Sequence, residues 1–268
     1  MKKQLLTAGL TILLLAIGLT GCLGGQYTDY FDEEYAANEN TVLKVTALNG
    51  QIEILTWEND IVSLNAIKRS AISREELDNI DINVDESGNI IKIETLYIGQ
   101  RITQPSVDMN IKVPNYVIVD TVKTSNGAII IEDAKGNITA DSSNGAITIK
   151  NVDGFVSATT SNGKIEVTDT TGIKSLHSSN GIINTEIYDF QQNISISTSN
   201  GRITVYINHL LNADIEMETS NGQITITGIT LNLTTNEEKH KQGTLGNGGN
   251  KISIKTSNGD IKLYKLEL

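Results

Sequence analysis

The sequence has one cysteine, two prolines and few aromatic residues, and each shortage excludes something. Cys22 has no second thiol in the chain, so an internal disulfide is excluded. Aromatic residues make up only 4% of the 268 residues, which suits narrow coils of chain better than a conventional core. With only Pro105 and Pro114, most of the backbone can donate hydrogen bonds in strands. Basic residues are also scarce, and the net charge of −11 argues against nucleic acid or anionic lipid as electrostatic partners.

What the chain has in abundance is one repeated tripeptide. Ser-Asn-Gly occurs seven times, and its glycines are separated by 18, 18, 18, 20, 21 and 37 residues. A nearly fixed period of this length is the signature of a repeat architecture. A weaker copy, Leu48-Asn49-Gly50, lies upstream. The repeated pairs, which we expect to stack as a ladder of turns, are Asn126, Gly127, Asn144, Gly145, Asn162, Gly163, Asn180, Gly181, Asn200, Gly201, Asn221, Gly222, Asn258 and Gly259.

Aliphatic residues alternate with polar ones on both sides of each copy. Ile129 and Ile131 follow the first glycine, and Ile138 and Ala140 precede the second motif. Such runs of period 2 predict short strands with one buried face. Asn-Gly tolerates positive φ and therefore predicts a tight corner between them. A Thr or Ser two positions before each asparagine shares the parity of the aliphatics and is expected to face inward: Thr124, Ser142, Thr160, Ser178, Thr198, Thr219 and Thr256.

Asn-Gly between two strands also fits a β-hairpin, so two folds compete. A series of antiparallel hairpins would give a β-sandwich. Stacked parallel coils are favoured because one corner is the same in every repeat, whereas the opposite corner varies in length and composition. Identical residues at identical positions would then form ladders of hydrogen bonds. We therefore predict an all-β, right-handed parallel β-helix or solenoid with coils of about 18–21 residues, and keep the antiparallel β-sandwich as the alternative.

The N-terminal segment predicts a secretory signal. Lys2 and Lys3 precede an apolar run over residues 5–19, which is too short for a typical spanning helix. The following Leu19-Thr20-Gly21-Cys22 resembles the lipobox of prokaryotic lipoproteins, which is cleaved before its cysteine. We expect residues 1–21 to be a signal peptide and Cys22 to carry a lipid. The protein would then be anchored to the membrane with its body outside the cytoplasm; an uncleaved membrane anchor is the alternative.

The rest of the chain divides into segments whose repeats differ in regularity. Residues 22–40 have no period, and we predict that they form a flexible tether after the lipidated cysteine. Irregular terminal coils are expected, because the open end of a solenoid exposes strand edges. The predicted solenoid over 41–268 comprises irregular coils over 41–120, regular repeats over 121–229, a loop insertion over 230–250 and a final coil over 251–268.

No residue pattern indicates catalysis, a cofactor or a metal. His177, His209 and His240 lie at irregular spacing and are expected on the surface. Calcium-binding repeats need aspartates at the corner, where this chain has neutral asparagines. Polysaccharide-degrading β-helices need clustered carboxylates, and the acids here, such as Glu132 and Asp153, are scattered over the coils. A carbohydrate-active enzyme is therefore the least favoured function. Sequons at Asn137, Asn193 and Asn232 are formal acceptors of glycans.

The run Thr-Ser-Asn-Gly-x-Ile-x-Ile, repeated about every 18–20 residues, resembles the putative adhesin family of bacterial and archaeal surface proteins. The segments 48–57, 113–115 and 248–261 match the same pattern. The resemblance covers residues 41–268, nearly the whole mature chain. It implies a β-solenoid domain of unknown function and brings no catalytic residue with it.

Together these patterns predict a non-enzymatic, lipid-anchored surface protein that acts as an adhesion or binding scaffold. Its partners would be the membrane, through the lipid on Cys22, and a surface, glycan or protein ligand. The alternative is a self-assembling structural protein of the envelope, in which exposed solenoid ends stack on one another. Charged Lys262, Lys265 and Glu267 near the C-terminus would blunt such pairing, so we expect a monomer.

Overall fold

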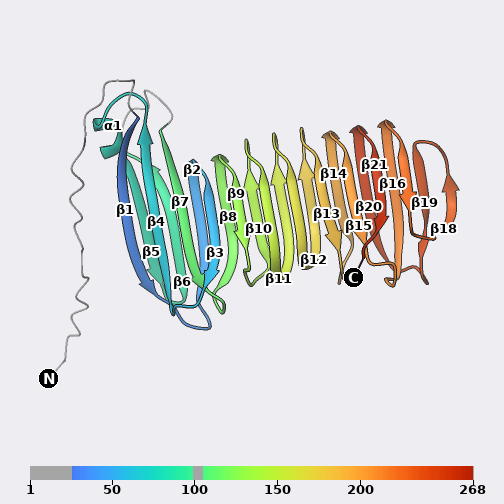
Figure 1. The fold of residues 1–268 in the computed structure, drawn as a ribbon, viewed down its shortest axis with the longest axis horizontal. Helices are drawn as coiled ribbons and strands as arrows, with labels where there is room; N and C mark the ends of the chain where they lie inside the picture. The colour runs from blue at the N-terminus through green and yellow to red at the C-terminus, as the bar shows by residue number, and fades with distance from the viewer. Residues whose placement is uncertain (1–25, 99–104, 268) are drawn as a thin grey trace.

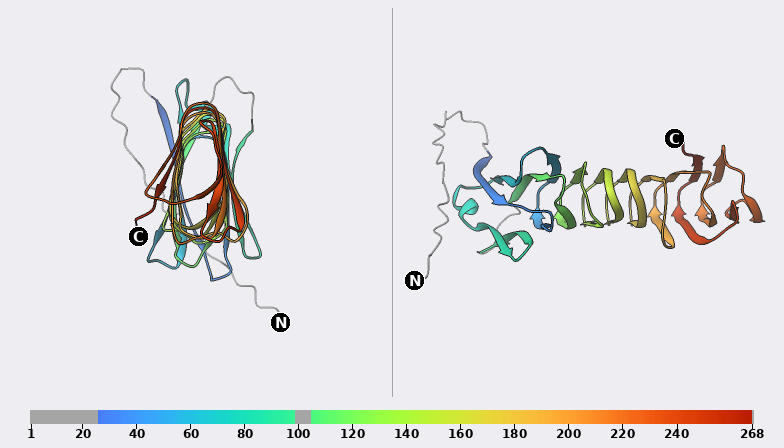
Figure 2. Two further views of the ribbon diagram at one scale, coloured as in Figure 1. Left: turned by 90° about the vertical axis from the view of Figure 1, so that its right-hand side faces the viewer. Right: turned by 90° about the horizontal axis from the view of Figure 1, so that it is seen from below.

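Each coil of the chain contributes one strand to each of two facing rows of strands. The computed structural model describes residues 26–98 and 105–267 and forms an elongated, flattened solenoid (Figures 1 and 2). We call the strands before the Ser-Asn-Gly corner the leading row and those after it the trailing row. In spatial order the leading row contains β5 (Ile80–Ser87), β6 (Ile90–Tyr97), β2 (Val42–Asn49), β8 (Ile118–Asn126), β10 (Ile138–Ser142), the second halves of β11 (Ile147–Thr160) and β12 (Ile165–Ser178), β14 (Ile194–Asn200), β20 (Asn250–Asn258), β16 (Ala213–Asn221), β19 (His240–Leu245) and β18 (Asn232–Asn236).

The trailing row lies opposite, and aliphatic side chains from both rows fill the space between them. The trailing row contains β1 (Tyr27–Ala36), β4 (Ile61–Ser70), β7 (Ser106–Pro114), β3 (Ile52–Trp57), β9 (Ile129–Glu132), the first halves of β11 and β12, β13 (Ile183–Ile187), β15 (Ile203–Ile207), β21 (Ile261–Lys265) and β17 (Ile224–Thr227). Ile147 pairs in parallel with Ile129 and Ile165, and all three are fully buried. Parallel, in-register stacking confirms the solenoid and contradicts the antiparallel sandwich.

The order of the coils in space differs from their order in the sequence. The last coil, β20 and β21, lies between the coil of β14 and β15 and the coil of β16 and β17. Figure 1 shows β20 and β21 between β14 and β16. At the other end, the coil of β2 and β3 lies between β6 and β7 on one side and β8 and β9 on the other. The final coil expected over 251–268 is therefore an interior coil of the stack.

Antiparallel strands cover both ends, and here two sequence predictions do not hold. Residues 27–36, expected in the tether, form β1, which pairs antiparallel with β4 and packs Phe31 and Tyr35 against the core. Residues 232–236 and 240–245, expected in a loop insertion, form the antiparallel hairpin of β18 and β19 on β16. In both places an end coil would otherwise present an unpaired strand edge. The short helix α1 (Glu75–Asp78) contacts β4, β1 and β5 at the N-terminal end.

The predicted signal peptide and the lipidation site Cys22 lie outside the described residues. Within the ranges that the structure describes, no helix has both the length and the apolar character needed to cross a membrane.

Candidate binding surface

The repeated corner forms a continuous line of side-chain amides, which we call the asparagine ladder. Asn162 Nδ2 donates a hydrogen bond to Asn144 Oδ1 over 2.7 Å, and Asn180 Nδ2 donates to Asn162 Oδ1 over 2.9 Å. Stacked amides of this kind recur wherever identical strands lie in parallel register. With bond lengths of 2.6–2.9 Å, the ladder runs in spatial order through Asn49, Asn126, Asn144, Asn162, Asn180, Asn200, Asn258 and Asn221.

The glycines of this corner allow close approach of the backbones, and only Gly50 and Gly259 among them have the positive φ expected from the sequence. Gly127, Gly145 and Gly163 are absent from the residues with positive φ. A Cβ added at Gly163 would instead lie 2.0 Å from the carbonyl oxygen of Gly145 in the adjacent coil. Consecutive coils therefore touch through backbone atoms at this edge, and any side chain would push them apart.

The Thr and Ser residues before each asparagine are buried, as their parity predicts. Their hydroxyls do not bond to one another. Thr160 Oγ1 donates to the carbonyl oxygen of Gly145 over 3.0 Å, and Ser178 Oγ donates to that of Gly163 over 3.1 Å. Each hydroxyl thus satisfies a glycine carbonyl of the neighbouring coil and fixes the spacing of the corner. The other five such donors are Thr124, Ser142, Thr198, Thr219 and Thr256.

Alanine substitution along the ladder should lower the free energy of unfolding according to the number of bonds removed. Asn162→Ala removes two ladder bonds and should destabilise by about 1–2 kcal/mol, whereas Asn221→Ala at the end of the ladder removes one and should cost roughly half as much. Urea unfolding measures both. The control is Asn247→Ala in the exposed turn after β19, where only the backbone N–H makes a bond. Equal losses for all three variants would show that the ladder bonds do not stabilise the fold.

A second line of polar groups faces outward from the leading row, and we call it the hydroxyl row. Thr139 pairs with Thr121 on one side and Ser157 on the other. Strand spacing places these hydroxyls about 4.8 Å apart. In spatial order the hydroxyl row contains Thr121, Thr139, Ser157, Ser175, Ser195 and Ser253. The row takes one equivalent outward position on six neighbouring leading strands, and it was not predicted from the sequence. With the exposed serines of the corner, it makes this face a flat, regularly spaced polar surface.

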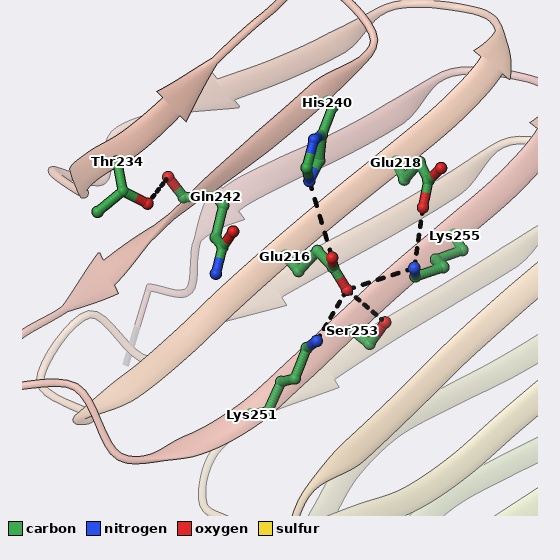
Figure 3. A network of polar contacts seen from close by, with 8 residues as sticks. All are labelled: Glu216, Glu218, Thr234, His240, Gln242, Lys251, Ser253 and Lys255. Atoms are coloured by element: carbon green, nitrogen blue, oxygen red, sulfur yellow. Dashed lines mark hydrogen bonds and ion pairs between the residues drawn. The ribbon is translucent and has the colours of Figure 1, made fainter.

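Charged residues replace hydroxyls where the interior coil β20 meets β16, as Figure 3 shows. Glu216 Oε2 lies 3.0 Å from Lys251 Nζ and 3.3 Å from Lys255 Nζ, and Lys255 Nζ also lies 2.8 Å from Glu218 Oε2. His240 of β19 approaches Glu216 Oε1 at 3.7 Å. The Glu216 side chain is only 17% exposed. These contacts join three neighbouring strands and hold the interior coil in place.

Acid should weaken this charged cluster. The hydrogen bond from Lys251 lowers the pKa of Glu216, and the hydrogen bond from Lys255 lowers the pKa of Glu218. Both carboxyl groups ionise more readily in the folded chain than in the unfolded one. They therefore stabilise the fold above the ordinary pKa of glutamate, and this stabilisation is lost as the pH falls through the lowered pKa of the folded state.

We expect Glu216→Gln to lower the free energy of unfolding at pH 7 by about 1 kcal/mol and to flatten its decline below pH 5. Urea unfolding at pH 7, 5 and 3 measures this. The matched control is Glu238→Gln at the exposed hairpin tip, outside the charged cluster. Identical pH profiles for the two variants would show that the cluster does not stabilise the fold.

The trailing face carries tyrosines at its C-terminal half. Tyr206 and Tyr264 stack with ring centroids 5.3 Å apart. Tyr188 donates to Asp169 Oδ1 and Glu186 Oε2, each over 3.1 Å. Burial and the two carboxylates raise the pKa of Tyr188 well above its usual range. Tyr206 and Tyr264 therefore form one stacked pair on the face opposite the hydroxyl row, and Tyr188 is held separately by its two carboxylates.

The histidines and the sequons lie at separate places. His177 is exposed and its Nδ1 lies 2.9 Å from Ser197 Oγ, and His209 is exposed in the turn after β15. His240 joins the charged cluster, which the sequence did not indicate. No group of three or more His, Cys, Asp and Glu residues within 26–98 and 105–267 could hold a metal ion. The three sequon asparagines, all exposed, are Asn137, Asn193 and Asn232.

Parallel coils with a laddered asparagine corner define a β-solenoid domain. Residues 43–264 match the model of the Toastrack DUF4097 family, and the chain belongs to that family. No curated protein is significantly similar to it. Solved structures that match the chain include a putative cell adhesion protein from Clostridium sporogenes, which is 15% identical with a TM-score of 0.36, over 89% of this chain and 100% of its own.

Two further structures of this kind are described as putative adhesins. The one from Bacteroides fragilis is 11% identical with a TM-score of 0.39, over 89% of this chain and 97% of its own. The one from Parabacteroides merdae is 12% identical with a TM-score of 0.39, over 91% of this chain and 97% of its own.

Proposed function

We propose that this protein is a non-enzymatic binding scaffold, anchored to the membrane by a lipid on Cys22 and exposed outside the cytoplasm. The observation that carries the proposal is the repetition of one polar surface along the solenoid. The asparagine ladder and the hydroxyl row present the same groups on successive coils, which suits repeated contacts with an extended or repetitive ligand. A catalytic centre, in contrast, brings several unlike groups together at one place.

The position of the first strand supports a defined orientation at the membrane. β1 begins at Tyr27, five positions after Cys22. A lipid on Cys22 would therefore hold the N-terminal end of the solenoid close to the bilayer, and the hairpin of β18 and β19 would lie at the far end (Figure 1). The diacylglycerol expected of a lipoprotein holds through two acyl chains, which gives stable anchoring.

Lipid attachment is tested by metabolic labelling with a fatty-acid analogue. The wild-type protein should incorporate label and fractionate with membranes, and Cys22→Ala should lose both properties. Ser125→Ala, at an exposed corner serine, is the control and should behave as the wild type. Label retained by Cys22→Ala would overturn the assignment of the anchor.

The binding role is tested with the lipidated, full-length protein in phosphatidylcholine vesicles. These vesicles should be retained on surfaces coated with mucin, collagen or fibronectin, while vesicles without protein should pass. Retention on none of the three coatings would count against a scaffold for surface ligands. Release of reducing ends from polysaccharides by the same preparation would establish an enzyme and contradict the proposal.

We favour a monomer over the structural, self-assembling alternative because of the outer strand at the N-terminal end. The exposed positions of β1 include Asp32, Glu33 and Glu34, and a second copy pairing there would face the same negative charges. Light scattering of the full-length protein in detergent should therefore give the mass of one chain per micelle. Filaments in the same preparation would favour the structural role instead.

A further inference from the structure

The second corner of the solenoid, opposite the asparagine ladder, contains a hollow where the regular stacking breaks down. Its lining includes Asn137, Asp153, Phe155, Lys174, Gln191 and Gln192. These residues come from four successive passes of the chain, between the start of β10 and the connection from β13 to β14. The hollow therefore belongs to the stack of coils itself and not to one mobile loop.

Three departures from the repeat meet at this hollow. β11 has one residue more than β12 between the pairs Val152–Thr170 and Phe155–Gly172. Next, β12 has an extra residue: Val156 and Ser157 are adjacent in β11, but Lys174 lies between their partners Ile173 and Ser175 in β12. Finally, the coil that ends at Gly201 is two residues longer than the preceding ones, and Gln191 and Gln192 lie in its longer connection. Bulges re-aim side chains and occur preferentially near functional sites, and insertions in repeat proteins often form the binding face.

Phe155 gives the hollow an aromatic wall. A Cβ added at Gly172 would lie 2.7 Å from Phe155 Cε1, so the ring packs directly over the backbone there. The Phe155 N–H donates to Asn137 Oδ1 over 3.1 Å, which fixes the base of the side chain. Phe155 nevertheless remains partly exposed. An aromatic ring that packs on one side and is open on the other offers an apolar surface to the C–H face of a sugar.

The polar lining suits hydroxyl groups. Lys174, Gln191 and Gln192 make no hydrogen bond or ion pair with any other described residue through their side chains. Each glutamine amide can donate and accept, as sugar hydroxyls also do, and Asn137 keeps its Nδ2 for donation. The single positive charge of Lys174 is balanced by Asp153. A concave site with an aromatic wall, several amides and no net charge matches a neutral ligand rich in hydroxyl groups.

We propose that this hollow binds a neutral glycan, with one sugar ring stacked on Phe155 and its hydroxyls bonded by Asn137, Gln191 and Gln192. The inference rests on the proposed scaffold function and names its ligand class. The hydroxyl row and the asparagine ladder would remain outside this subsite. The hollow lies at one point of the solenoid, so each chain binds one terminal or internal sugar of the glycan there.

The test begins with full-length protein in detergent on an array of neutral and sialylated oligosaccharides, followed by titration calorimetry with the neutral oligosaccharide that gives the strongest signal. We expect Phe155→Ala and the double variant Gln191→Ala/Gln192→Ala each to weaken binding at least fivefold. The matched controls are Tyr30→Ala, an exposed aromatic of β1, and Gln242→Ala, an exposed amide of β19, and both should bind as the wild type. Because Phe155 packs on Gly172, thermal unfolding of its variant is measured in parallel, and the exposed glutamine variant tests the site independently.

Failure to bind any neutral oligosaccharide overturns the inference, as does preferential binding of sialylated ones. Unchanged affinity of the double glutamine variant also overturns it, because the glycan must then bind elsewhere. The vesicle assay separates this failure from failure of the scaffold function. Vesicles with Phe155→Ala that are retained like the wild type would contradict the glycan site and leave the scaffold standing, whereas wild-type vesicles that are never retained would contradict the scaffold itself.

Discussion

Deleting residues 250–268 should unfold the C-terminal third of the solenoid and not merely shorten it. The deletion removes β20 and β21, which pair with coils on both sides. Five buried side chains are lost, Ile252, Ile254, Ile261, Leu263 and Leu266. Burial of such side chains contributes on the order of 10 kcal/mol in total, comparable with the whole free energy of unfolding of a typical domain, about 5–15 kcal/mol.

Hydrogen exchange read by mass spectrometry would follow this effect along the chain. Amides of β16 and β17 should lose protection by at least ~100-fold, because their parallel neighbours β20 and β21 have gone. Amides of β19, which pairs with β16, should lose protection with them. The matched control replaces the hairpin region 230–248, which has the same length, by a short Gly-Ser linker. That variant should keep protection in β17 and β20 and lose it only in those amides of β16 that bond to β19. Similar exchange in the two variants would contradict the interior position of the last coil.

Gly163→Ala should destabilise the protein by more than about 3 kcal/mol, which is unusually large for the addition of one methyl group. Its Cβ would lie 2.0 Å from Gly145 O and 3.0 Å from Ala146 N, so two backbones must separate. Coils on both sides should suffer, because the stability of a repeat protein is a sum of nearest-neighbour interfaces.

The control for this substitution is Gly88→Ala in the turn between β5 and β6. Gly88 has φ of 63°, and a Cβ there would meet nothing within 4 Å. Alanine at that position should cost only the strain of the left-handed region, about 1–2 kcal/mol. Thermal and urea unfolding compare the two variants directly. A smaller loss for Gly163→Ala than for Gly88→Ala would show that the coils can separate easily at the corner.

The sequence predicted the features that every coil repeats. One motif at one corner was enough to predict parallel stacking, and parity alone placed residues such as Thr160 and Ser178 inside. Because the repeats are so alike, the sequence does not indicate the spatial order of the coils at the ends. Asn258 and Asn221 occur in equivalent motifs, so nothing local tells which of them stacks on Asn200. The gap of 37 residues before Gly259 is the only sign that the stacking order changes.

Other features depended on contacts that local patterns do not encode. Residues 27–36 lack the period-2 alternation of a strand, and they form β1 because β4 offers an edge at that end. The need for glycine at the corner was predicted, but its cause is the approach of a neighbouring backbone, which no single repeat reveals. The hollow at the second corner likewise arises from irregularities in three different coils that only the stack brings together.

The interior position of the last coil also sets the order in which a newly made chain can become complete. Residues 194–227 emerge from a ribosome or an export pore before residues 250–265, yet β14 and β16 become neighbours of β20 and never of each other. Until the final segment arrives, both strands present free edges with aliphatic residues at the same positions, and their direct pairing is a competing trap. The last coil is therefore completed by insertion, and a chain interrupted near its end lacks the strands that separate two similar edges.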